Sequence, residues 1–422
     1  MNETPLPITV LSGFTGAGKT TLVDALLANA EGVRIGAVTC GKAASGADRE
    51  TTELPNGCML LALADRSLQA LENAITWIAE QRRFDAILVE TSGIADPMTI
   101  AEHLAFGDDD DATLAGRAHL DTFVTVIDAA SFMRDYASSD SLAERGLHQP
   151  DDDEDDSKTV VETLVEQIEF CDVIVINKID LADAGEVEKI AHVLHGLNPR
   201  ALQLRAQSAN VPSGEVLNTG RFDFDTTASA PGWLAILNGE HPANDEPDAS
   251  GVGHFVYRAR RPFHPERLWN LLHQEWPGVL RAKGFFWLAT RSDVGGSLSQ
   301  AGGTCRHGPA GVWWAAQDRS EWPTDDPELE AEIVAEWYGD PDDNRIGDRR
   351  QELVLIGLNI DPAAWQDSFD ACLLTDDEWA LGPDAWQRFA DPFPAWDIEE
   401  HDHDHDHDHD HGPDCDCDDH RH

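Results

Sequence analysis

The sequence predicts an α/β protein with a mostly parallel sheet flanked by helices, followed by a smaller α+β domain and a disordered tail. In the first half of the 422 residues, short apolar runs alternate with helical patterns, as a parallel sheet requires. A stretch rich in Gly, Pro, Ser, Asn and Asp follows, and the chain ends in a low-complexity segment that cannot bury apolar surface. We expect domains at 1–211 and 251–390, a linker at 212–250 and a tail at 391–422.

The expected strands of the first half are apolar throughout, which is typical of strands covered on both faces. The second domain shows Leu268, Trp269, Leu271 and Leu272 at helical spacing, and an acidic insertion at 323–345. We expect strands at 8–11, 33–38, 86–89, 123–127, 173–176, 255–259, 285–289, 312–315 and 352–356, and helices at 20–28, 67–80, from about 159, 265–275 and 362–373.

The charge of the chain is strongly negative, with 79 acidic against 30 basic residues and a formal net charge of −49. Such a surface repels phosphate backbones and anionic lipids, which argues against nucleic acid or membrane partners. The acidic residues are spread along the chain, so adaptation to concentrated salt is the simplest explanation. The sequence lacks a long apolar run and a signal-peptide pattern, and its seven cysteines do not indicate a disulfide framework. We expect a soluble cytoplasmic protein.

A phosphate-binding motif, G-x-x-x-x-G-K-T, occupies residues 13–20 between an expected strand and an expected helix. The glycines allow backbone N–H groups to converge on phosphate oxygens at a helix N-terminus. Lys19 is expected to reach the β- and γ-phosphates, and the Thr20 hydroxyl to bind Mg²⁺. A chance glycine-rich turn is the alternative. The expected phosphate-binding residues are Gly13, Gly16, Ala17, Gly18, Lys19, Thr20 and Thr21.

A second motif, Glu90-Thr91-Ser92-Gly93, follows the expected strand at 86–89. A carboxylate at the carboxyl end of a parallel strand faces the nucleotide crevice. Glu90 could hold Mg²⁺ through water or orient the attacking water, and the Gly93 N–H could sense the γ-phosphate. We expect catalytic roles for Lys19, Glu90 and Gly93. The alternative for Glu90 is an acidic cap before a helix.

A third motif, Asn177-Lys178-Ile179-Asp180, follows the strand expected at 173–176. An aspartate accepts hydrogen bonds from the N1–H and exocyclic amine of guanine, which adenine cannot offer, and the Lys178 stem can pack over the base. Asn177, Lys178 and Asp180 are therefore the expected base-binding residues. Asp128 ends another expected strand, either as a functional residue or as a plain strand terminus. The motifs together predict a P-loop GTPase that uses GTP, GDP and Mg²⁺ and converts GTP to GDP and phosphate.

The chain resembles the CobW-like GTPases over most of its length. The resemblance is carried by the three motifs, by the segments Leu-Ser-Gly-Phe at 11–14, Thr-Ser-Gly-Ile-Ala-Asp-Pro at 91–97 and Leu-Asn-Pro-Arg-Ala at 197–201, and by the second domain. It implies GTP hydrolysis coupled to delivery of a divalent transition metal, zinc or cobalt first, to a client metalloprotein that the sequence does not identify.

One metal-binding motif of that family is reduced here. The family has Gly-Cys-x-Cys-Cys between its second and third strands, whereas this chain has Gly57-Cys58 followed by Met59, Leu60 and Leu61. One thiolate does not make a closed site for Zn²⁺ or a similar ion. Cys58 is a candidate metal ligand, with a small buried hydrophobe as the alternative. Cys40, after the second strand, might approach it.

The tail carries most of the other candidate ligands. Imidazole suits Zn²⁺ and other divalent transition metals, and interleaved aspartates add electrostatic attraction and second-shell acceptors. A solvated acidic tail is the alternative, and the interleaved Asp and Cys-Asp-Cys argue against a purification tag. The candidate ligands are His401, His403, His405, His407, His409, His411, Cys415 and Cys417.

Three functions are consistent with this sequence. The first is a GTPase that gathers a metal and delivers it to a client. The second is a metal-buffering protein without transfer, which the reduced cysteine motif favours. The third is a regulatory GTP-binding protein that captures a partner through its second domain.

Overall fold

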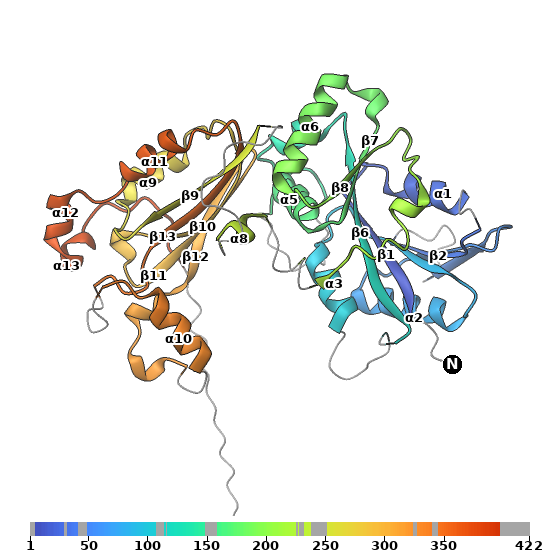
Figure 1. Ribbon diagram of the computed structural model, residues 1–422, viewed down its shortest axis with the longest axis horizontal. Coiled ribbons are helices and arrows are strands. Elements are labelled where there is room, and N and C mark those ends of the chain that lie inside the picture. Colours follow the sequence, from blue (N-terminus) through green and yellow to red (C-terminus); the bar gives the residue numbers. More distant parts are fainter. Residues whose placement is uncertain are drawn as a thin grey trace, which may run out of the picture.

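The structure is a computed structural model that describes residues 5–28, 32–40, 49–106, 114, 116–147, 158–224, 227, 232–237, 251–323, 327–339 and 345–396. Within these ranges the chain forms two sheets with helices packed around them (Figure 1). No helix in these ranges has both the length and the apolar composition needed to cross a lipid bilayer. The candidate metal ligands at 401–417 lie outside the described residues.

The strands of the first sheet are β1 (Leu6–Ser12), β2 (Ile35–Cys40), β3 (Arg49–Glu53), β4 (Met59–Leu63), β5 (Ala86–Glu90), β6 (Ala118–Asp128), β7 (Val173–Asn177) and β8 (Leu202–Arg205). Their order is β3-β4-β2-β5-β1-β6-β7-β8. All neighbouring pairs are parallel except β3 with β4. The mostly parallel sheet is therefore confirmed. Because parallel strands point the same way, the carboxyl ends of β5, β1, β6 and β7 meet at one edge.

Helices cover both faces of this sheet, as Figure 1 shows. Successive residues of β1 point to opposite faces, so Ile8 and Val10 join one core cluster and Leu11 joins the other. The first cluster includes side chains of α2 (Leu68–Glu80), α3 (Pro97–Phe106), α4 (Phe132–Tyr136), α5 (Val160–Phe170) and α6 (Ala184–Leu197). The second includes α1 (Lys19–Ala28) and the loop after β8.

The second sheet is antiparallel, with the order β12-β11-β10-β13-β9. Side chains of two helices share its core, including Leu268, Leu272, Trp365 and Phe369. The strands are β9 (Val252–Ala259), β10 (Val279–Trp287), β11 (Val294–Ala301), β12 (Thr304–Val312) and β13 (Gln351–Leu358). The helices are α8 (Gly232–Leu237), α9 (Pro265–Leu272), α10 (Pro327–Glu336), α11 (Pro362–Asp370), α12 (Asp376–Leu381) and α13 (Pro383–Trp386).

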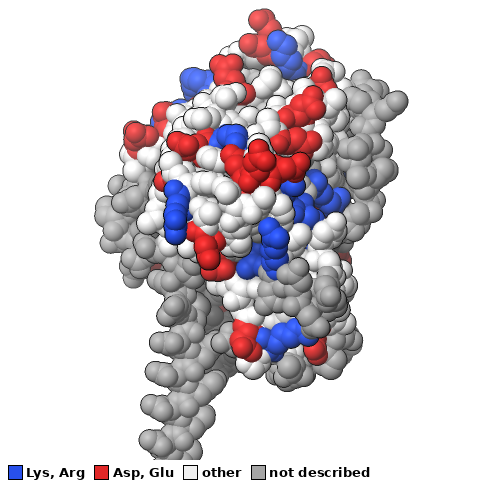
Figure 2. All heavy atoms as spheres, turned by 90° about the vertical axis from the view of Figure 1, so that its left-hand side faces the viewer, with Lys and Arg blue, Asp and Glu red and all other residues white. Residues whose placement is uncertain are grey.

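Acidic and basic side chains alternate on the face of the molecule drawn in Figure 2, which is the left-hand side of Figure 1. The elements on that side form ion pairs, such as Arg267 with Glu378 at 2.6 Å and Arg261 with Asp376 at 2.9 Å. The Arg267 guanidinium lowers the pKa of Glu378 to about 2. Part of the large negative charge of the chain is therefore paired locally.

The structure contains elements that the sequence did not predict in both domains, among them β3, β4, β8, α3 and α6 in the first. Residues 314–316 form a 3₁₀ turn rather than the end of a strand, and the segment expected at 285–289 is the end of the longer β10. The strand β11 was not predicted, because Val-Gly-Gly-Ser-Leu-Ser-Gln-Ala has no clear apolar alternation. Its conformation is stabilised by backbone pairing with β10 and β12 on both sides.

Parts of the predicted linker and tail are packed structure. Val216 and Leu217 are buried in the first domain, and the Thr9 hydroxyl donates to the Val216 carbonyl at 3.0 Å. Near the other end, Phe393 is buried, and Asp391 pairs with Arg291 at 2.8 Å. The described structure thus continues to residue 224 on the first domain and to residue 396 on the second.

The two sheets are joined by a packed interface between α4, α5, α6 and the second sheet. The buried Tyr136 hydroxyl donates to the Leu280 carbonyl of β10 at 2.5 Å. Leu280 and Ala301 belong to the same core cluster as the first domain, and a Cβ on Gly196 of α6 would lie 2.7 Å from Leu280 Cδ1. The second domain is therefore held directly against the helices of the first.

One buried amide holds the C-terminal end of α5. Asn198 Nδ2 donates to the carbonyls of Ile168 and Cys171 at 2.8 Å each and to that of Glu169 at 3.2 Å. Asn198 is 3% exposed, so no bulk water replaces these bonds. The last carbonyls of a helix need such external donors.

Replacing Asn198 by alanine should lower the free energy of unfolding by about 2 to 3 kcal/mol, because buried carbonyls lose their donor. Urea unfolding followed by circular dichroism measures the change. Gln366→Ala removes an exposed amide bonded to Asp370 at 3.0 Å and should change stability by less than about 0.5 kcal/mol. Equal stability of Asn198→Ala and wild type would contradict the role given to this amide.

Candidate nucleotide-binding site

The candidate site lies at the carboxyl edge of the first sheet, where four strands bring their polar end residues together. The phosphate-binding motif follows the central strand β1, with β5 and β6 on its two sides. Glu90 ends β5, Asp128 ends β6 and Asn177 ends β7. Register places Leu11 beside Glu90 and Asp128 beside Asn177. The three sequence motifs therefore meet at one edge.

The phosphate-binding loop is closely packed against Asn177, the last residue of β7. Gly18 has φ of +110°, and a Cβ there would lie 2.4 Å from Asn177 Nδ2, so a side chain is excluded on both grounds. The helix α1 begins directly afterwards at Lys19. Backbone N–H groups at the start of this helix can face an anion, which the helix dipole favours. Ala17 is buried, whereas Thr20 and Thr21 are exposed in the first turn of α1.

Lys19 and Glu90 are buried opposite charges at this edge. Lys19 Nζ donates to the Gly13 carbonyl at 2.5 Å and to the Phe14 carbonyl at 3.4 Å. Burial lowers the pKa of Lys19 from 10.5 to about 8, although the negative charge of Glu90 opposes the shift. Burial also raises the pKa of Glu90, opposed by the Thr20 hydroxyl and by Lys19. An anion bound at Lys19 and a cation bound at Glu90 would each stabilise the charged form of the side chain.

Thr20 and Glu90 form a pair of hard oxygen donors. The Thr20 hydroxyl donates to Glu90 Oε1 at 2.5 Å, which joins α1 to the end of β5. Mg²⁺ prefers oxygen ligands of this kind and retains several waters. These two residues therefore fit a magnesium ion beside the phosphates, held directly or through water.

The loop after β5 lies over the phosphate-binding loop. A Cβ on Gly93 would lie 2.2 Å from Thr15 Oγ1 and 2.6 Å from the Thr15 nitrogen, so only glycine fits there. The loop is fixed at its start, since the Thr91 N–H donates to the Leu11 carbonyl at 3.0 Å. The backbone at Gly93 is thus placed against Thr15 of the phosphate-binding loop.

Asn177 and Lys178 contact the phosphate-binding loop. Asn177 is 2% exposed, and its Nδ2 donates to the Ala17 carbonyl at 3.0 Å. Lys178 Nζ donates to the Gly16 carbonyl at 2.7 Å and pairs with Asp128 at 2.7 Å. Asp128 therefore ends β6 and also holds the Lys178 ammonium. Lys178 itself has φ of +59°, which turns the chain sharply after β7.

Asp180 is exposed, beside a loop that the sequence analysis missed. Residues 206–210 follow β8, the parallel neighbour of β7, so they reach the same edge. The Ile179 N–H donates to the Ala206 carbonyl at 3.3 Å, and the Ala209 N–H donates to Asn177 Oδ1 at 2.7 Å. Ser208 and Ala209 both have positive φ. The signal available in the sequence was the position of this loop at a strand end.

Cys58 directly precedes β4, at the end of that strand opposite the nucleotide-binding edge, and is buried in the core. It is 1% exposed, its Sγ accepts from the Ile35 N–H at 3.3 Å, and its thiol donates to the Val33 carbonyl at 3.6 Å. Cys40 pairs with Leu63 at the other end of β4, about 16 Å away by strand rise, so the expected approach of Cys40 to Cys58 is wrong.

No group of three His, Cys, Asp or Glu side chains is arranged to hold a metal ion in the part of the chain that the structure describes. The packing of Cys58 favours the small buried hydrophobe over the ligand. Its role as a metal ligand stays a prediction, since Cys58 belongs to no such three-residue group among the described residues.

The phosphate-binding loop, its acidic partner and the guanine motif define the class of this protein, a P-loop GTPase. Comparison with known families gives the particular group. Residues 7–205 match the family described as CobW/HypB/UreG, nucleotide-binding domain, and residues 252–373 match the Cobalamin synthesis protein cobW C-terminal domain. The chain belongs to the CobW family, as its sequence motifs predicted.

Similar proteins cover most of the chain. Zinc-regulated GTPase metalloprotein activator 1 of Dictyostelium discoideum is 36% identical over 413 residues, which are 92% of this chain and 84% of that protein. Zinc chaperone CobW of Sinorhizobium sp is 28% identical over 304 residues, 67% of this chain and 82% of that protein. The solved structure of Zn(II)-bound YjiA GTPase from E. coli covers 88% of this chain and all of that one, with 20% identity and a TM-score of 0.40.

GTP binding should take up a proton near pH 8. The pKa of Lys19 in the free protein is about 8, and phosphate keeps the ammonium charged, so about half a proton enters per GTP at pH 8. At pH 6.5 Lys19 is already protonated and should take up almost none. Calorimetry of Mg·GTP binding in two buffers of different ionisation enthalpy measures this number. The same uptake at both pH values would exclude Lys19 as the titrating group.

Proposed function

We propose that this protein hydrolyses GTP at the edge formed by β1, β5, β6 and β7 and couples that reaction to binding and delivery of a divalent transition metal, with zinc as the first candidate. The observation that carries the proposal is the meeting of Lys19, Glu90, Asn177 and the Gly93 loop at one sheet edge. Buried, preorganised charges of this kind stabilise the charge that develops during phosphoryl transfer.

Each residue of the edge has a role in the proposed hydrolysis. The backbone of residues 13–18 and the Lys19 ammonium hold the β- and γ-phosphates. Thr20 and Glu90 would hold Mg²⁺, which would neutralise phosphate charge. Glu90 also orients the attacking water, and the Gly93 N–H donates to the γ-phosphate. Release of phosphate removes the partner of that N–H and frees the loop.

Guanine selection is assigned to Asp180. Its carboxylate is exposed just after β7, and Asn177 and Lys178 hold the turn that precedes it. A carboxylate accepts from both N1–H and the exocyclic amine of guanine. Residues 206–210 complete the base pocket beside it.

Asp180→Ala should weaken GTP binding about 100-fold, because two hydrogen bonds to a charged acceptor are lost. The weak binding of ATP should stay unchanged, since adenine cannot donate to this carboxylate. Displacement of a fluorescent guanine nucleotide measures both affinities. The control is Asp183→Ala, three residues after Asp180, which removes an exposed aspartate whose side chain makes no capping hydrogen bond. This control variant should bind GTP normally. Equal loss in both variants would contradict the assignment.

The metal is proposed to be gathered by the tail. Two relatives carry names that include zinc. The described residues contain no three-ligand cluster, and Cys58 lies in the core. The His-Asp repeat from His401 onward and Cys415 and Cys417 supply the imidazole and thiolate ligands that Zn²⁺ accepts. A metal-buffering or regulatory GTP-binding protein without transfer is the second candidate, favoured by that missing cluster.

Deletion of residues 401–422 should reduce the zinc content of the protein and abolish any zinc dependence of its GTP turnover. The variant with asparagine at the six histidines that alternate with aspartate, from His401 to His411, should behave alike, because imidazoles rather than chain length bind the ion. Cys58→Ala should leave both properties unchanged. Metal analysis and phosphate release, with Mg²⁺ alone as the reference condition, give the result. If deletion changes neither zinc content nor turnover, the tail has no role in metal handling.

A further inference from the structure

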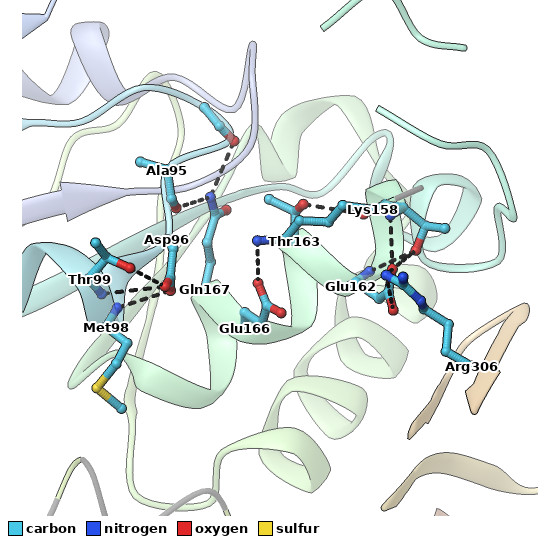
Figure 3. Close-up of polar contacts among 12 residues, drawn as sticks. Ala95, Asp96, Met98, Thr99, Lys158, Glu162, Thr163, Glu166, Gln167 and Arg306 are labelled. Atoms are coloured by element: carbon cyan, nitrogen blue, oxygen red, sulfur yellow. Dashed lines mark hydrogen bonds and ion pairs between the residues drawn. The ribbon is translucent and has the colours of Figure 1, made fainter. Parts of the chain in front are cut away.

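The helix α5 lies between the nucleotide-sensing loop at 91–96 and the second domain. It is firmly placed at both ends. Thr159 and Glu162 form reciprocal capping bonds at its start, and Asn198 holds its last carbonyls. Both ends of the helix are therefore satisfied by specific hydrogen bonds. Figure 3 shows Ala95 and Asp96 of the loop beside Gln167 of this helix, and Arg306 of the second domain beside Glu162.

Gln167 is the contact between α5 and the loop. Its side chain is 1% exposed, and Nε2 donates to the Gly93 carbonyl at 3.2 Å and to the Ala95 carbonyl at 3.4 Å. Its Oε1 is buried without a hydrogen-bond partner among the described residues. A buried amide that leaves its oxygen unpaired is costly for stability alone. The orientation therefore serves the two loop carbonyls.

The loop is anchored on either side of these carbonyls. Thr91 bonds to the Leu11 carbonyl, and Asp96 accepts from the Met98 N–H at 3.1 Å and the Thr99 hydroxyl at 2.6 Å at the start of α3. The other side of the loop borders a pocket of about 300 Å³ lined in part by Cys40, Leu71, Ser92 and Thr99. Ile94 and Ala95 of this loop also line the pocket, and Gln167 holds the carbonyls of Gly93 and Ala95.

Two acidic residues of α5 contact the second domain. Glu169 accepts from Arg281 Nε of β10 at 2.9 Å, with side chains 10% and 5% exposed. Glu162 accepts from Arg306 of β12 at 3.2 Å. Arg281 is itself fixed by Ser299 Oγ at 2.9 Å. The second domain is therefore bonded to the same helix that bonds to the loop.

We propose that Gln167 is a positioning residue for the γ-phosphate-sensing loop, and that α5 passes the state of this loop to the second domain through Glu162 and Glu169. A γ-phosphate that binds the Gly93 N–H displaces the peptide whose carbonyl Gln167 holds. The two hydrogen bonds donated by the Gln167 side chain then break or reform together. As a result, α5 shifts against Arg281 and Arg306. By thermodynamic reciprocity, the contacts of the second domain also change the preference of the site for GTP over GDP.

The test uses four variants of the full chain, each with a single substitution. Gln167→Met keeps the side-chain volume but removes the amide donors. Gln203→Met is its matched control, because Gln203 Nε2 donates to the Ala191 carbonyl at 3.1 Å away from the loop. Arg306→Ala removes the exposed interdomain pair. Arg34→Ala is its control, since Arg34 pairs with Asp85 at 2.8 Å at the opposite edge of the sheet.

Two quantities are measured for each protein. The first is the ratio of GDP to GTPγS dissociation constants, obtained by displacement of a fluorescent GDP. The second is amide hydrogen exchange at 279–283 and 304–307 with GDP and with GTPγS. We expect exchange at these strands to depend on the nucleotide in wild type and in both controls. Gln167→Met should lose that dependence and change the affinity ratio about tenfold.

Arg306→Ala should change the affinity ratio about threefold although it lies in the other domain. This variant leaves the Gln167 amide in place, so it tests the proposal even if Gln167→Met does not fold. The proposal is overturned if exchange in wild type is the same with both nucleotides, or if Gln167→Met responds as Gln203→Met does. It is also overturned if the ratio for Arg306→Ala equals that for Arg34→Ala and wild type.

Discussion

The buried amide of Asn177 is the interaction on which the nucleotide site depends. Its nitrogen donates to the Ala17 carbonyl of the phosphate-binding loop, and its oxygen accepts from the Ala209 N–H. One side chain thus fixes the distance between the phosphate loop, the guanine motif and the loop after β8. Gly18 must lack a side chain because this amide lies directly behind it. A site that selects guanine and holds phosphates needs both parts at a fixed separation.

The nucleotide-binding edge must attract an anion although the chain as a whole is strongly negative. A protein with a formal charge of −49 repels a nucleotide that is itself highly negative. Lys19 and the N-terminal amides of α1 supply positive charge at this edge, whereas the charge of Lys178 is paired with Asp128. Burial of Lys19 and Glu90 makes each of them dependent on an oppositely charged ligand. Binding of nucleotide and of Mg²⁺ is therefore expected to be tightly coupled.

Much of the first domain was predictable from the sequence, because its apolar runs and motif spacings are local signals. The parallel sheet and the strands before Glu90 and Asn177 were found in this way. The second domain was less predictable, since β11 depends on pairing with distant strands rather than on its own pattern. The loop at 206–210 and the contacts of Gln167 were missed because tertiary packing alone brings them to the edge. The same packing shows that Cys58 and Cys40 cannot meet.

We propose that one edge of the first sheet binds the nucleotide through Lys19, Glu90, Gly93 and Asp180, with the loop held by Gln167. A crystal structure of the chain with GDP, Mg²⁺ and aluminium fluoride tests it most directly. The account predicts the base on Asp180, Mg²⁺ beside Thr20 and Glu90, and fluoride on the Gly93 N–H. A nucleotide whose base or terminal phosphate analogue contacts none of these residues would contradict it.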